Sequence, residues 1–165
     1  DLIIYCAAVQ PPVALHEYSF EKDEAMVNTN FLGAVAWLNQ AATRFERARS
    51  GQIVGISSIA GDRGRVGSPA YNASKAGLNT YLEALRNRLS RYGVTVTTIK
   101  PGFVDTELLK NAPKTFWVIS PEEAAAQTLT AIRRRRQVAY VPSRWQFVGL
   151  AVRSVPSVIF RRLSF

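Results

Sequence analysis

The chain of 165 residues is long enough for one domain with its own core, and its 47% apolar content excludes a disordered protein. A single cysteine, Cys6, excludes an internal disulfide and is typical of a reducing compartment; we expect its side chain to be small and buried. The net charge of +9 is uneven, because residues 131–165 carry eight arginines and no acid. A nucleic-acid-binding domain would spread its positive charge over a surface of the whole domain, whereas here the charge is concentrated in the tail. We therefore expect no nucleic-acid partner.

The N-terminal part of the chain alternates between apolar runs and helical segments. Residues 2–7 form a short apolar run that predicts a buried strand, and the prolines after it predict a loop. A long helix is predicted from about Tyr18 to Phe45, followed by a second buried strand at 53–56. Because the chain opens on an apolar strand without an initiator methionine, we expect it to be the C-terminal part of a longer domain.

The middle of the chain predicts one more helix and one more strand. Apolar residues recur at helical spacing from Pro69 to about Tyr92, and Gly93 then fits a helix stop. The β-branched run at 94–99 predicts a strand, and a loop is expected over residues 103–120.

The C-terminal part begins with a strong helix signal. Ser120 is a typical N-cap, and Pro121 is typical of a first helical position. This helix should end in the arginine cluster 133–136, which suits a helix C-terminus and is expected to be solvated. A last strand is predicted at 138–141, and the tail from Trp145 is expected to be helical with an interruption at a proline.

Strands that alternate with helices predict a parallel α/β sheet with right-handed crossovers. In such sheets, ligands bind beyond the carboxyl ends of the strands. Ala7, Ser58 and Pro101 each follow a predicted strand, so we expect them along one edge. We divide the chain into a catalytic portion, residues 1–142, and a basic amphipathic tail, residues 143–165.

Tyr71 and Lys75 are spaced for proton chemistry. Residues four apart share one face of a helix. A free tyrosine has a pKa near 10 and is a poor proton donor or acceptor at pH 7, but a nearby ammonium lowers that pKa. Such a pair can exchange a proton with a substrate oxygen.

Three further elements accompany this pair. Ser58 lies 13 residues before Tyr71, Asn30 lies in an Asn-Phe-Leu-Gly run on the preceding helix, and Pro-Gly-Phe-Val-Asp-Thr follows the third strand. Together these elements resemble the classical short-chain dehydrogenase/reductase family over residues 1 to about 142. The resemblance implies a Rossmann-like doubly wound parallel sheet, of which only the C-terminal part is present. It also implies an NAD(P)-dependent oxidoreductase that interconverts a carbonyl and a secondary alcohol.

The resemblance implies a role for each catalytic residue. Tyr71 would be the general acid/base, and Lys75 would lower its pKa and bond the nicotinamide ribose. Ser58 would hold the substrate oxygen, with Ser57 as the less favoured candidate because of its spacing to Tyr71.

The same resemblance implies the remaining contacts. Asn30 would hold a water that links Lys75 to solvent, and Asn28 is its rival on the same helix. The residues implied to contact the cofactor, besides Tyr71 and Lys75, are Ala7, Pro101, Gly102 and Thr106.

The sequence departs from the family pattern in two places. The usual Asn-Asn-Ala-Gly run is replaced by Tyr-Cys-Ala-Ala at residues 5–8, which removes the basis for the expected adenine contacts. No Gly-x-x-x-Gly-x-Gly turn, which would receive the pyrophosphate, occurs in the 165 residues. We therefore expect the chain to be inactive by itself, and its preference for NAD or NADP is not readable. The alternative is a non-catalytic remnant of the family or a membrane-associating module.

Other catalytic chemistries receive little support from the sequence. His16 has no partner motif and is expected at the surface. A Ser-His-Asp hydrolase would need a nucleophile elbow, which is missing. No Cys/His cluster supports a metal site.

The loop and the tail indicate the partners. The loop after the third strand suggests an apolar or lipid-linked small-molecule substrate through Phe103, Leu108, Leu109, Phe116 and Trp117. The tail mixes large apolar residues with four arginines, which predicts a helix packed on the body or on another subunit, or else a helix at an anionic membrane surface. The apolar faces of the helices around 35–45 and 78–89 favour a homo-oligomer. We expect a cytoplasmic protein, with contact to a membrane through the tail as the alternative.

Overall fold

The computed structural model describes residues 1–111 and 115–163. Within them, a parallel sheet contains four strands in chain order: β1 (Leu2–Tyr5), β2 (Gly51–Ile56), β3 (Val94–Pro101) and β4 (Val138–Val141). Tyr5 pairs with Gly55, Ile56 with Ile99 and Pro101 with Val141, so the carboxyl ends of the strands share one edge.

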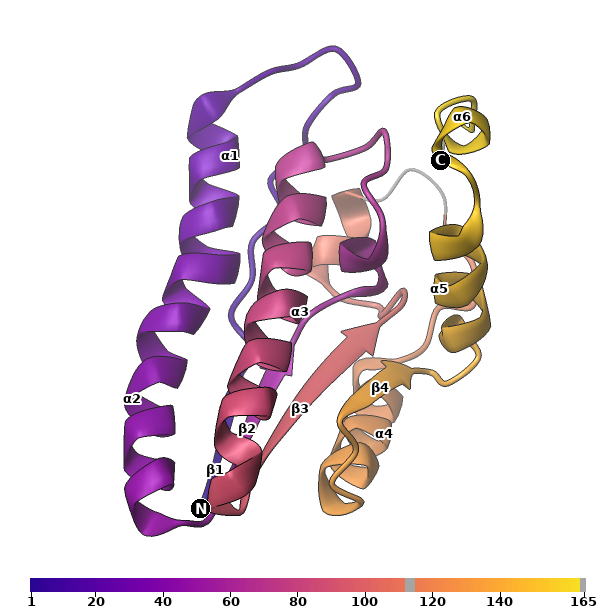
Figure 1. The fold of residues 1–165 in the computed structure, drawn as a ribbon. Coiled ribbons are helices and arrows are strands. Elements are labelled where there is room, and N and C mark those ends of the chain that lie inside the picture. Colours follow the sequence, from indigo (N-terminus) through magenta and orange to yellow (C-terminus); the bar gives the residue numbers. More distant parts are fainter. Residues whose placement is uncertain (112–114, 164–165) are drawn as a thin grey trace.

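The crossovers between the strands are helical. β1 and β2 are joined by α1 (Phe20–Val27), a π-helical turn (Asn28–Leu32) and α2 (Gly33–Ala48), which together form one long rod. α3 (Pro69–Leu89) joins β2 to β3, and α4 (Pro121–Arg133) joins β3 to β4. The chain ends in α5 (Trp145–Ser154) and the short α6 (Ser157–Phe160), which lie together along one side of the molecule in Figure 1. Single 3-10 turns occupy Ile59–Asp62, Ser90–Tyr92 and Glu107–Asn111.

Helices cover both faces of the sheet. Successive residues of a strand point to opposite faces, and Ile53 and Val54 of β2 are both fully buried. Ile53 packs in a core with α2 and α3, whereas Val54 packs with residues of α4, β3 and β4. Figure 1 shows α2 and α3 side by side on one face and α4 on the other. This two-sided covering is the doubly wound arrangement that the sequence predicts.

Most predicted elements are present, but β1 is not the buried strand that was expected, because Leu2 and Ile4 are exposed. The strand at 138–141 has the expected bounds, and the helix after Ser120 begins as predicted, with Ser120 Oγ accepting a hydrogen bond from Glu123 N at 3.1 Å. The break of the tail at Pro156 is also confirmed. The π-helical turn was not predicted, and part of the expected loop at 103–120 is a 3-10 turn. Residues 112–114 of that loop lie outside the described residues.

The expectation for Cys6 is wrong. β1 ends at Tyr5 and not at residue 7, so Cys6 lies beyond the strand ladder, and its side chain is exposed. His16 is exposed, as expected, and so are Arg133–Arg136.

Candidate active site

Tyr71 and Lys75 lie in the first turns of α3, above the carboxyl end of β2. Both are buried, with exposed fractions of 8% for Tyr71 and 2% for Lys75. Lys75 Nζ donates a hydrogen bond to the carbonyl oxygen of Ile56 at 3.0 Å and lies 5.8 Å from the centroid of the Tyr71 ring. The predicted pairing on one helix face is therefore present.

Burial dominates the electrostatics of this pair. It lowers the pKa of the Lys75 ammonium from 10.5 to about 8, and the nearby Cys6 acts in the opposite direction. Burial also raises the pKa of the Tyr71 hydroxyl, while a hydrogen bond with Ser58 and the charge of Arg65 lower it by less. The expected lowering by Lys75 is not among these causes, and Tyr71 is accordingly a protonated donor at neutral pH.

The two serines after β2 have different surroundings. Ser57 Oγ donates a hydrogen bond to the backbone oxygen of Lys75 at 3.1 Å and so fastens α3 to the strand. Ser58 Oγ accepts a hydrogen bond from Ala60 N at 3.1 Å, which leaves its proton for another acceptor. This difference supports Ser58 as the residue that would hold a substrate oxygen.

Asn30 is placed by the π-helical turn, a feature that is frequent at functional sites. Its side chain is fully buried, accepts from Val9 N at 2.8 Å, and donates to Val9 O at 3.0 Å and to Ser74 Oγ at 3.2 Å. Asn28, its rival, is exposed. Asn30 thus holds the loop after β1 against α3, and its role toward a water stays a prediction.

Tyr5, which replaces the first asparagine of the family run, has a defined role in the fold. Its hydroxyl donates a hydrogen bond to the backbone oxygen of Thr29 in the π-helical turn at 2.5 Å. A Cβ at Gly33 would lie 2.5 Å from this hydroxyl, so the glycine makes room for the tyrosine. The departure from the family pattern therefore ties β1 to the turn that carries Asn30.

The Pro-Gly turn at the end of β3 is covered by the tail. Gly102 N donates to Val141 O at 2.9 Å, and a Cβ at Gly102 would lie 2.0 Å from Nε1 of Trp145. Trp145 also lies at the centre of an aromatic cluster with Phe103, Phe116 and Trp117, with ring centroids 4.9 to 5.7 Å from its own. Trp145 was not among the predicted site residues, since no local signal pairs it with Gly102.

The other predicted cofactor residues lie at the same edge but are less enclosed. Ala7 and Thr106 are exposed, and Pro101 is half-buried. The Thr106 hydroxyl donates to Val104 O at 3.4 Å. The structure therefore brings the strand-end residues to one edge, as predicted, and leaves Ala7 and Thr106 open toward solvent.

Sequence reasoning missed a buried ion pair beneath the site. Lys100 Nζ lies 2.5 Å from Asp62 Oδ1, and the Tyr140 hydroxyl donates to Asp62 Oδ2 at 2.7 Å. Asp62 ends the 3-10 turn that begins after Ser58, and Lys100 directly precedes Pro101. The pair therefore holds the serine turn and the Pro-Gly turn in a fixed relation.

Arg65 is a second missed residue. Its charge lies close enough to Tyr71 to lower the pKa of the tyrosine, and burial lowers the pKa of Arg65 itself. One of its amino groups donates to Asn72 Oδ1 at 3.3 Å, whereas its Nε is buried without a hydrogen-bond partner in the described part of the chain. A cation beside the tyrosine would stabilise the phenolate that forms when the proton leaves.

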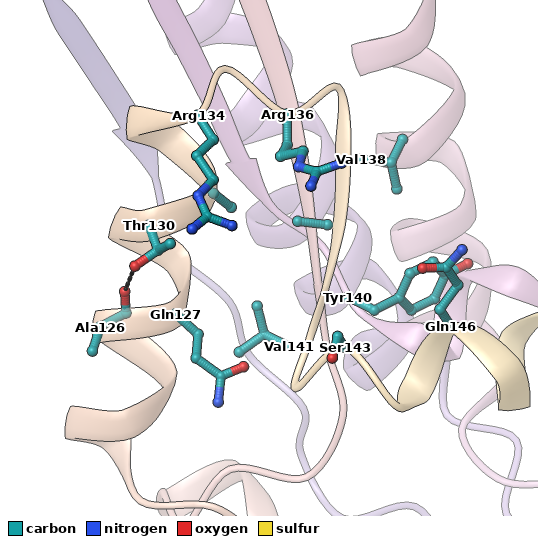
Figure 2. A pocket seen from close by; sticks show the side chains of 12 residues that line it. Ala126, Gln127, Thr130, Arg134, Arg136, Val138, Tyr140, Val141, Ser143 and Gln146 are labelled. Carbon is teal, nitrogen blue, oxygen red and sulfur yellow. Dashed lines mark hydrogen bonds between the residues drawn. The ribbon is translucent and has the colours of Figure 1, made fainter.

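A hollow of about 410 Å³ lies apart from this edge, between α4 and the outer strand β4. Figure 2 shows Arg134 and Arg136 near one end of it, with Gln127, Ser143 and Gln146 farther along its walls. None of the candidate catalytic residues lines it, so we do not assign it to the reaction. Within residues 1–111 and 115–163, no cluster of His, Cys, Asp and Glu is placed to hold a metal ion, and no helix is long and apolar enough to cross a membrane.

Comparison with known proteins identifies the family. The family model described as short chain dehydrogenase matches residues 1–116, so the chain belongs to the short-chain dehydrogenase family. An uncharacterized oxidoreductase of Myxococcus xanthus is 41% identical over 108 residues, which are 66% of this chain and 43% of the relative. The 3-oxoacyl-[acyl-carrier-protein] reductase FabG of Chlamydia trachomatis is 37% identical over 112 residues, 67% of this chain and 45% of that protein.

A solved structure shares the fold. The short chain dehydrogenase of Burkholderia cenocepacia, in complex with NADP, superposes with a TM-score of 0.84 at 22% identity and covers 98% of this chain and 70% of that one. The chain spans about half the length of the curated relatives that it matches.

Proposed function

We propose that this chain supplies the proton-transfer half of an NAD(P)-dependent oxidoreductase that interconverts a carbonyl and a secondary alcohol. The observation that carries the proposal is the meeting of Tyr71, Lys75 and Ser58 at the carboxyl end of β2, with both Tyr71 and Lys75 buried. Two findings on related proteins support the same reaction: the matching family is one of dehydrogenases, and one relative is named 3-oxoacyl-[acyl-carrier-protein] reductase.

Each residue of the candidate site has its own proposed role in carbonyl reduction. The Ser58 hydroxyl would donate a hydrogen bond to the substrate oxygen and hold it beside Tyr71. Tyr71, protonated at neutral pH, would give its proton to that oxygen as the alcohol forms; the Ser58 hydrogen bond and the charge of Arg65 favour this loss of the proton, whereas burial opposes it. The charges of Lys75 and Arg65 would stabilise the remaining phenolate until a proton returns. Oxidation of the alcohol would use the same groups in reverse.

The donor set at this edge fits the nicotinamide end of the cofactor. An ammonium has three N–H groups, and Ile56 O takes one from Lys75, which leaves donors for ribose hydroxyls. The nicotinamide, when bound, supplies or accepts the hydride. Pro101, Gly102 and Thr106 would border the ring, and Ala7 would lie farther along the same edge. The glycine-rich turn for the pyrophosphate does not occur in the 165 residues. The choice between NAD and NADP depends on a different residue, the acidic or basic one that contacts the adenosine ribose, and it stays open.

The rim of the site favours an apolar or lipid-linked substrate. Phe116 and Trp117 are exposed next to the Pro-Gly turn, and their rings contact each other and Trp145. Leu108 and Leu109 lie half-buried in the same segment. A large apolar group beside the reacting carbonyl would bury this surface.

We also propose a homo-oligomer formed through the rod of α1 and α2. Trp37 of α2 and Leu32 of the π-helical turn are exposed on it, and a second copy would cover them. Sedimentation of the intact protein at micromolar concentration tests this, since a monomeric mass contradicts it.

The reaction is tested in the intact protein with a panel of apolar ketones and either NADH or NADPH. Tyr71→Phe removes the proton donor, so turnover should fall by about 10²–10⁴-fold while cofactor binding, followed by fluorescence of the reduced cofactor, is retained. Tyr18→Phe changes an exposed tyrosine and should have no effect. Unchanged turnover of Tyr71→Phe contradicts the proposal, and absence of both binding and turnover in the unmodified protein favours the non-catalytic alternative.

A further inference from the structure

The outer surface of α5 and α6 carries four large apolar side chains that no described residue covers. Phe147 and Leu150 of α5 have exposed fractions of 76% and 58%, and Val158 and Ile159 of α6 have 59% and 53%. In α5, Phe147, Leu150 and Ala151 recur at the spacing of one helix face, so the exposed residues form a stripe.

The two helices are already anchored by their other side. Trp145 and Gly149 face inward from α5, where Trp145 covers Gly102 and Gly149 contacts Asp62 and Tyr140. Arg63 holds the far end, because it donates to the backbone oxygen of Arg153 at 3.2 Å and to Ser157 Oγ at 3.1 Å. The exposed stripe is therefore not the packing face of these helices.

Positive charge surrounds the stripe. Arg144, Arg153, Arg161 and Arg162 are exposed, and none of them takes part in an ion pair among residues 1–111 and 115–163. There is no Asp or Glu from residue 131 to the end of the chain. A second copy of this surface would bring like charges together, so the charge favours an anionic partner over self-association.

A hollow of about 410 Å³ opens beside α6, and it too is lined by both arginines and apolar side chains. It is lined by Arg63, Arg65 and Arg161 together with Val66, Phe160 and Leu163. Guanidinium groups next to apolar side chains match a phosphate headgroup that continues into acyl chains.

The apolar surface also reaches the rim of the candidate active site. The guanidinium of Arg144 stacks over Trp117 at 5.2 Å from the ring centroid and donates to its backbone oxygen at 3.5 Å. Phe147 follows one helical turn after Arg144, so the stripe begins one turn away from the residue that contacts the exposed Trp117.

From these observations we infer that the outer surface of α5 and α6 docks on an anionic lipid bilayer. The apolar stripe would enter the boundary between headgroups and acyl chains, and the arginines would bind lipid phosphates. The rim of the site would then face the same bilayer. This inference is independent of turnover, because binding to lipid is measured without substrate or cofactor.

Co-sedimentation of the intact protein with vesicles tests the inference. The vesicles contain phosphatidylcholine alone, or phosphatidylcholine with about a third phosphatidylglycerol, at about 0.1 M and about 0.5 M salt. We expect binding to the anionic vesicles at low salt, weak binding to the neutral ones, and a loss of binding at high salt. Equal binding to both compositions, or none to either, contradicts the inference.

Two variants and two matched controls separate the contributions. Replacing Arg153, Arg161 and Arg162 with Glu should lower the partition coefficient by at least about fivefold for each arginine. The same change at Arg134, Arg135 and Arg136, which are exposed beside α4, should lower it less. Phe147→Ser with Leu150→Ser should also reduce binding, whereas Tyr18→Ser with Phe20→Ser, at exposed aromatic positions elsewhere, should not.

Circular dichroism and mass by light scattering accompany each variant. A control triple that loses as much binding as the α5–α6 triple contradicts a localised surface. A change of oligomeric state in Phe147→Ser would show that another protein surface covers the stripe, which also overturns the inference.

Discussion

Two buried lysines at the same edge of the sheet have opposite surroundings. Lys100 lies 2.5 Å from the Asp62 carboxylate, which in turn accepts a hydrogen bond from Tyr140. Lys75 has a backbone carbonyl as its hydrogen-bond acceptor, and no carboxylate pairs with it in the described ranges 1–111 and 115–163. The first lysine is fixed by its counter-ion, whereas the second keeps donors free and has its pKa lowered to about 8.

The comparison indicates that two buried lysines at one edge of the sheet serve different purposes. Lys100 stabilises the fold, whereas Lys75 belongs to the candidate active site. A buried ion pair is rigid, and removing one partner leaves an uncompensated charge. A buried lysine without a counter-ion costs stability, and such a cost is typical of functional residues. Exchanging each lysine for methionine, which keeps the apolar stem and removes the charge, should therefore have different consequences at the two positions.

The largest effect is expected for Lys75→Met on activity. Turnover of the intact protein should fall by about 10²–10⁴-fold, because the ribose contact and the charge near Tyr71 are both removed. The free energy of unfolding at pH 7, from urea titration, should stay the same or rise, since an unpaired buried charge is lost. A large loss of stability in Lys75→Met would make this lysine a structural residue like Lys100.

Lys100→Met is expected to act on stability. Asp62 would be left buried without its cation, and the free energy of unfolding should fall by about 3–5 kcal/mol. The double variant Lys100→Met with Asp62→Asn removes both charges and should recover part of this loss in the same urea titrations. If the double variant is as unstable as the sum of the single changes, the two side chains do not interact as the structure indicates.

Lys75 should make the free energy of unfolding depend on pH, and the direction of this dependence tests whether its pKa is lowered. Its pKa is about 8 in the folded chain and near 10.5 when unfolded. Between these values the unfolded chain holds the proton that the folded chain has lost, so this group's contribution to stability rises with pH, by about 1 kcal/mol per unit. Below pH 8 the burial of the charge opposes folding, and above 10.5 the contribution levels off.

The measurement is the difference in free energy of unfolding between the unmodified protein and Lys75→Met from pH 7 to 10. Subtracting the variant removes the contributions of the other titrating groups. A difference that stays flat, or that falls as the pH rises, contradicts a lowered pKa at this lysine.

The smallest effect is expected where α5 contacts the ion pair. A Cβ at Gly149 would lie 2.7 Å from Asp62 Oδ2 and 2.9 Å from the Tyr140 hydroxyl, so Gly149→Ala should lower stability by about 1–3 kcal/mol. Gly64→Ala is the matched control, because a Cβ there has no atom within 4 Å. Equal melting temperatures of the two variants would mean that α5 does not pack closely against Asp62 and Tyr140.

Local patterns predicted the elements and the proton-transfer pair, because both depend on residues near each other in the chain. Helical spacing placed Tyr71 beside Lys75, and strand ends placed Ser58 and Pro101 at one edge. The pairing of Asp62 with Lys100 joins positions 38 residues apart and leaves no local signal. Cys6 was wrongly expected to be buried, because small apolar neighbours predict burial while the end of the pairing with β2 decides it.

The indole of Trp145 lies on Gly102, so the edge that carries the Pro-Gly turn is completed by a residue of α5, which follows the whole sheet in chain order. During translation, Tyr71, Lys75 and Ser58 leave the ribosome before the residue that covers this turn. A nascent chain can therefore have its proton donor in place while the turn beside it is still bare. Since α5 and α6 emerge together with Trp145, completion of the turn and display of the arginine-rich surface occur together, after the proton-transfer residues have emerged.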